Sequence, residues 1–134
     1  MAISQSLRNR AVVIEKYVTL AGTSGTTTGV SVPAGTLIIA AGFEPKNAVA
    51  DVSAYTIDIT DGTTTFANDL SLDAVAAGTI VVGTTAGLVA AADTVDVVTT
   101  ITGSPGEVEG RVFVVAIDVN DCVREGAAAT RDQV

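Results

Sequence analysis

Apolar and polar residues alternate in short runs along most of this chain, and alternation is the period of a β-strand. The clearest run is 55–60, "YTIDIT", in which Tyr55, Ile57 and Ile59 point one way and polar residues the other. Further strands are predicted at 11–20, 30–32, 37–43, 65–73, 80–82, 93–102 and 111–121. The pattern predicts an all-β, single-domain β-sandwich or jelly roll of about seven or eight short antiparallel strands, with a barrel as the other closed form.

Turn and loop residues separate these runs. The stretches 21–29, "AGTSGTTTG", and 83–92, "GTTAGLVAAA", are predicted as loops because they are rich in Gly, Thr and Ala. Pro33 and Gly35 predict a type II turn, and Asp61-Gly62 predicts a hairpin turn. After the first of these turns the chain alternates again, which predicts that four apolar residues share one face: Leu37, Ile39, Ala41 and Phe43.

The last predicted strand, 111–121, is apolar on both faces. Such a strand is expected in the middle of a sheet with cover on both sides. One cover is the domain core, and a neighbouring subunit is expected to supply the other. The sequence analysis assigns the contact between subunits to the face that carries Val112, Val114 and Ala116.

The length of 134 residues suits one domain, and its apolar residues are chiefly Val, Ala and Ile. We expect an N-terminal arm at 1–10, the β-sandwich at 11–124 and a C-terminal tail at 125–134. The core is expected to be thin, with some stability from association. The start of the chain lacks the apolar core of a signal peptide, and no run is long enough for a membrane helix.

The formal net charge of −8 argues against direct binding of nucleic acid, which requires clustered Lys and Arg. Three basic residues nevertheless fall within the first sixteen positions: Arg8, Arg10 and Lys16. This asymmetry is expected of a solvated terminal arm or of an arm that lies on an acidic partner surface.

The sequence offers little material for an enzyme. It has no histidine, and its one cysteine, Cys122, has no partner for a disulfide or a metal site. Several carboxylates come in pairs, but they lie beside predicted turns, where Asp favours local hydrogen bonds. We expect no enzymatic activity and no cofactor.

Four aspartates gather in one stretch, and calcium is the metal that such residues could bind. They are Asp58, Asp61, Asp69 and Asp73. Their spacing does not follow the order of an EF-hand loop. Solvent-facing turn residues are the interpretation that we favour, with calcium as the alternative.

Five short motifs occur in a fixed order: Pro33–Thr36, Asp58–Thr63, Ala76–Thr79, Ala91–Thr94 and Gly110–Val114. The series resembles the head decoration, or cement, proteins of tailed bacteriophages, in which a "PAGT" turn, a "DIGDGT"-like hairpin, an "AAGT" segment, an "AADTI" strand start and a "GRVxVxV" strand recur. The resemblance covers about residues 30–120. The arm and the tail have no counterpart in it.

This resemblance implies a jelly-roll-like sandwich on the outside of an icosahedral shell, where it bridges major capsid protein subunits against internal pressure. It implies a homotrimer more than a dimer, and a virion location without membrane contact. We assign the capsid contact to Leu7, Arg8, Arg10 and Lys16. The alternatives are a receptor- or glycan-binding β-module of a phage fibre or bacterial surface protein, and a calcium-dependent adhesion domain.

Overall fold

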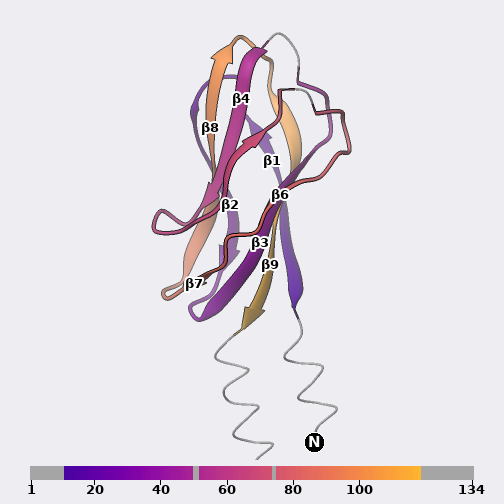
Figure 1. Ribbon diagram of the computed structural model, residues 1–134. Coiled ribbons are helices and arrows are strands. Elements are labelled where there is room, and N and C mark those ends of the chain that lie inside the picture. Colours follow the sequence, from indigo (N-terminus) through magenta and orange to yellow (C-terminus); the bar gives the residue numbers. More distant parts are fainter. Residues whose placement is uncertain (1–10, 50–51, 74, 119–134) are drawn as a thin grey trace, which may run out of the picture.

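The computed structural model of the protein describes residues 11–49, 52–73 and 75–118. The described residues contain nine strands and no helix (Figure 1). The strands are β1 (Val12–Leu20), β2 (Gly25–Val32), β3 (Thr36–Pro45), β4 (Val52–Thr60), β5 (Thr65–Ser71), β6 (Val81–Gly83), β7 (Gly87–Val89), β8 (Asp93–Gly103) and β9 (Val108–Asp118). Within this part of the chain, no helix of the length and apolarity that a membrane span requires is found.

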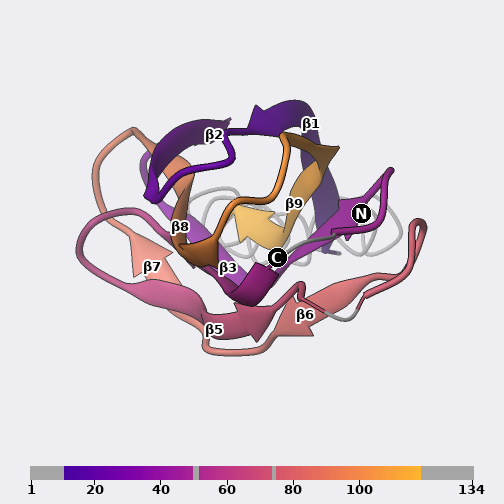
Figure 2. The ribbon, with the colours of Figure 1, turned by 90° about the horizontal axis from the view of Figure 1, so that it is seen from above.

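The strands form two antiparallel sheets that face each other as a sandwich (Figure 2). The five-stranded sheet has the order β1-β9-β3-β6, with β7 also paired to β3, and the four-stranded sheet has the order β2-β8-β4-β5. Strands from the first half of the chain therefore pair with strands from the second half in reverse order. β1 pairs with β9, β2 with β8, β3 with β6 and β7, and β4 with β5. This order of pairing is the jelly-roll topology, in which β6 and β7 share one strand position. The predicted all-β sandwich is confirmed.

Small aliphatic side chains fill the space between the sheets, together with a few aromatic ones. Tyr55, Ile57 and Ile59 of β4 are fully buried, as the alternation predicted. Phe43 and Phe66 are the other fully buried aromatic residues. The core is thus not thin, because these three rings supply volume that Val and Ala lack.

Two predicted loops contain strands. Residues 25–28 begin β2, although their Gly and Thr side chains carry no apolar signal, because β2 pairs with the well-patterned β8. In the same way, the three residues of β7 pair with β3 inside the predicted loop 83–92. Tertiary pairing outweighs local composition at both places.

The predicted alternation of β3 is wrong at its centre. A β-bulge between Ile38 and Ala40 shifts the register against β9. Ile38, Ala41 and Phe43 consequently face the core, whereas Ile39 is exposed. A bulge adds one residue to a strand and reverses the faces on either side of it, which a period-two pattern does not reveal.

The start of the first strand and the end of the last strand lie together at one end of the sandwich. Val12 at the start of β1 lies opposite Ala116 near the end of β9, on neighbouring strands (Figure 1). The predicted arm at 1–10 and tail at 125–134 lie outside the described residues, and the domain boundaries stay predictions.

Candidate interaction surface

The two outer faces of the sandwich differ in chemistry. On β4 of the four-stranded sheet, the outward positions hold Thr56, Asp58 and Thr60, because the residues between them are buried. Outward positions of β8 include Asp96 and Thr100. In the described chain, this sheet carries no exposed large apolar side chain and no Lys or Arg. Its outer face is therefore polar and acidic, as expected of a surface in contact with water.

The five-stranded sheet differs from the four-stranded sheet in that it exposes apolar side chains. Every exposed large apolar side chain of the described residues belongs to this sheet or to the loop that leads into β6. These residues are Val12, Val13, Tyr17, Ile39, Ile80, Val82 and Leu88. Contiguous apolar exposure of this kind marks an interaction site in a soluble protein.

The central strand β9 links the exposed residues across the face. Phe113, Val115 and Ile117 are half-buried and point outward, since Val112, Val114 and Ala116 between them are buried in the core. The sequence-based choice of face was therefore wrong. Val112, Val114 and Ala116 pack against the other sheet and cannot contact a second subunit, and the opposite side of β9 is the accessible one.

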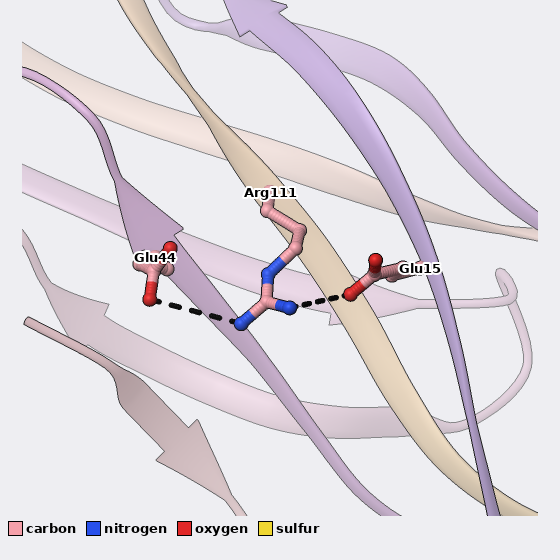
Figure 3. Close-up of polar contacts among 3 residues, drawn as sticks. All are labelled: Glu15, Glu44 and Arg111. Atoms are coloured by element: carbon pink, nitrogen blue, oxygen red, sulfur yellow. Dashed lines mark hydrogen bonds and ion pairs between the residues drawn. The ribbon is translucent and has the colours of Figure 1, made fainter. Parts of the chain in front are cut away.

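A charged cluster lies on the same outer face (Figure 3). Arg111 of β9 donates a hydrogen bond to Glu15 of β1 at 2.5 Å, and its other terminal nitrogen lies 3.7 Å from a carboxylate oxygen of Glu44 on β3. The hydrogen bond to Glu15 and the charges of both carboxylates raise the pKa of Arg111. The Arg111 side chain is only 26% exposed, so the cation is held between the two acids at the surface.

Sequence reasoning did not single out this cluster. A signal was present, because Arg111 is the one cation in the apolar run of β9, and Glu44 falls between apolar residues. Strand order was needed to bring the three together, since β1 and β3 flank β9 in the sheet.

Phe113 connects the charged cluster to the apolar residues. The Arg111 guanidinium carbon lies 5.7 Å from the centroid of the Phe113 ring, within the range of a cation–π contact. The same ring covers Gly42, the direct partner of Phe113 on β3. Phe113 therefore joins the charged cluster to the β3 side of the face.

A shallow pocket of about 280 Å³ lies where the charged end of this face meets the β3–β4 connection. Its lining includes Tyr17, Thr19, Lys46 and Glu109. The Lys46 ammonium lies 4.4 Å from the centroid of the Tyr17 ring. Sugars bind aromatic rings by stacking on a face, and Lys46 already occupies one face of Tyr17. The glycan-binding alternative therefore gains no support from this pocket.

The predicted capsid-contact residues are described only in part. Lys16 lies on the edge strand β1 and is exposed. Its position opposite Val112 places it toward the inner side of the sheet, at the open edge of the sandwich. Leu7, Arg8 and Arg10 lie outside the described residues, so their role stays a prediction.

Local hydrogen bonds engage all four clustered aspartates. Asp61 accepts from the backbone N–H groups of Thr63 and Thr64, at 2.8 and 2.7 Å. Asp58 accepts from the backbone of Asp69, and Asp73 accepts from the hydroxyl of Ser71.

These contacts bear on the turn and on the calcium alternative. Gly62 has a φ of +90°, so the predicted Asp61-Gly62 turn between β4 and β5 is confirmed. Across the described ranges, no three His, Cys, Asp or Glu residues gather as a metal site.

Comparison with known proteins gives a structural likeness only. No family model matches the sequence, and no curated protein matches it. The fold is similar to a chain of the cyanophage Pam1 capsid asymmetric unit, with a TM-score of 0.65, 14% identity, and 81% of this chain and 85% of that chain covered. It is also similar to a chain of the capsid of Helicobacter pylori bacteriophage KHP30, with a TM-score of 0.55, 14% identity, and 81% and 92% covered. The shared feature is the fold over most of each chain.

Proposed function

We propose that this protein is a non-enzymatic structural component of a phage virion. The observation that carries the proposal is that the whole jelly roll, rather than a fragment, is shared with chains of two phage capsids. The motif series in the sequence supports the same assignment independently of the structure.

Within the virion, we propose a decoration role on the outside of the capsid. The contrast between the two faces supports it. A protein that sits on a shell needs one face for its neighbours and one face for water, and this sandwich has an apolar face and an acidic, threonine-rich face. Many copies on one shell bind with avidity, so each contact can be modest.

The proposed partners are the major capsid protein and further copies of the chain. Leu7, Arg8, Arg10 and Lys16 are proposed to contact the capsid protein. Association as a trimer is the prediction from the motif resemblance.

The test is binding to shells assembled from the major capsid protein of the same virus. Purified protein is mixed with shells, the shells are sedimented, and the bound protein is quantified. We expect saturable binding, and loss of at least about 90% of it when residues 1–10 are deleted and Lys16 is changed to Glu, because each lattice contact is weak. Absence of binding by the intact chain would overturn the decoration role. Full binding by the altered chain would overturn only the assignment of the contact residues.

A further inference from the structure

Exposed large apolar side chains gather on the outer side of the five-stranded sheet, and nothing in the described chain covers them: Val13, Tyr17, Ile39, Val82 and Leu88. Val12 pairs with the buried Ala116 and faces the inner side instead. We propose that the outer face of the five-stranded sheet is the surface on which a second copy of this chain packs. The proposal deepens the proposed association of copies by naming its surface. It does not depend on binding to a shell.

The apolar residues run across the whole width of the sheet. Val13 lies on the edge strand β1, and its partner Val115 lies on β9. At the opposite edge, Leu88 of β7 pairs with Leu37 of β3, and Val82 of β6 pairs with Gly42. Partners in a register share a face, so these side chains form one surface from edge to edge.

The size of the face suits an interface between proteins. The eleven residues of β9 span about 36 Å, and four strand positions at about 4.8 Å span about 19 Å. The flat footprint is then about 700 Å², close to the ~800 Å² that each partner buries in a stable complex. A contact that covered only one edge of the five-stranded sheet would bury much less than the ~800 Å² of a stable complex.

The distribution of charge permits two copies to approach through this face. Asp58 and Asp96 of the four-stranded sheet point outward on the far side of the sandwich, whereas Asp61 and Asp93 lie near Leu88 at the β7 edge. On the proposed face, Arg111 is already paired with Glu15 and Glu44. A second copy can therefore cover the centre of the face without leaving that cation unpaired, which would be costly.

The experiment compares lysine substitutions on the two faces in the full-length chain. Val82→Lys and Leu88→Lys place a charge on the apolar face at positions that are 49% and 52% exposed, so folding is expected to survive. Thr100→Lys places the same charge on an exposed outward position of the four-stranded sheet as the matched control. Mass is measured by light scattering over a range of concentrations, and circular dichroism checks the fold.

We expect the unaltered chain and Thr100→Lys to form multiples of the 13.4 kDa chain. Val82→Lys and Leu88→Lys are expected to weaken association by about 30-fold or more. A dimer and a trimer both satisfy the proposal, because either covers the face with a second copy.

Three results would overturn the proposal. One is a monomer at all concentrations for the unaltered chain. Another is a multimer that Thr100→Lys disrupts and Val82→Lys does not. If Val82→Lys leaves the multimer intact but abolishes sedimentation with shells, the capsid protein covers this face instead, and the second copy is excluded as its occupant. Failure of the unaltered multimer to bind shells would contradict the proposed function but not the proposed contact between copies.

Discussion

The ring of Phe113 lies over Gly42 on the neighbouring strand and fills the space that a side chain at position 42 would need. A Cβ atom built there would come within 2.6 Å of the ring and 2.5 Å of the Val81 carbonyl oxygen. Such distances are shorter than van der Waals contact, so the glycine is required by its neighbours on β9 and β6.

Gly42→Ala is therefore expected to lower the free energy of unfolding by about 1–3 kcal/mol, because the Phe113 ring and β6 must move. Gly25→Ala is the matched control, since no atom lies within 4 Å of a Cβ there. Urea denaturation measures both. Equal free energies of unfolding for the two variants would contradict this, because they would show that Phe113 and β6 can move without loss of stability.

Arg111→Met is expected to lower the free energy of unfolding slightly at low salt, because it leaves Glu15 and Glu44 without their shared cation. The loss should shrink in 1 M NaCl, where surface charges are screened. Lys16→Met removes an exposed cation that has no ion pair in the described part of the chain, and it should have little effect. Denaturation at both salt concentrations is the measurement, and a loss independent of salt would assign the role of Arg111 to its packing.

Stability at high pH is expected to depend on Tyr55. Burial raises the pKa of Tyr55 to about 12, from an ordinary value of 10.0, because the charged phenolate is disfavoured in the core. The unfolded chain then releases this proton first, so the free energy of unfolding is unaffected below pH 10. It falls by up to about 3 kcal/mol as the pH rises from 10 to 12.

Denaturation of the unaltered chain and of Tyr55→Phe, measured in parallel between pH 8 and pH 12, isolates this contribution. Other groups that titrate in this range affect both chains alike. Parallel pH profiles for the two chains would contradict the assignment.

Asp61→Ala is expected to cost about 1–2 kcal/mol, because it removes the acceptor for two backbone N–H groups in the β4–β5 turn. Asp61→Asn keeps a side-chain oxygen and should retain most of the stability. Thermal unfolding compares the two variants. A similar loss in both would indicate that the charge, and not the hydrogen bonds, supports the turn.

Addition of calcium or of EDTA is expected to leave the melting temperature unchanged within error. Asp61, Asp58 and Asp73 each use an oxygen in a separate local hydrogen bond. A ligand that binds only the folded state would raise the melting temperature. A rise that saturates with calcium would restore the adhesion-domain alternative.

The sequence predicted the fold class because the strongest signals in it are local. The alternation at 55–60 gave β4 and its buried face, and Asp61-Gly62 gave the following turn. The missed features depend on partners distant in the chain. β7 exists because it pairs with β3, and the bulge at Ile39 appears only in the register with β9.

The candidate surface was predictable only in outline. The apolar pattern of β9 correctly indicated a central strand of the sheet, but alternation alone cannot tell which side faces the core. The size of the side chains does not identify the core-facing side either. Val112 and Val114 point inward, whereas the larger Phe113 points outward over Gly42. The cluster of Arg111, Glu15 and Glu44 could be predicted only from the order of the strands, and no single segment of the sequence reveals that order.

The opposition of Val12 and Ala116 at one end of the sandwich has a mechanical consequence. A force that pulls the two ends of the chain apart would unzip β1 from β9, breaking the backbone hydrogen bonds a few at a time. A force that pulls Val12 of β1 and Val108 of β9 apart along the strands would instead load many such bonds in parallel, because these two residues lie at opposite ends of the antiparallel pair. The pair of strands therefore resists shear along its length better than tension at the end where Val12 and Ala116 meet.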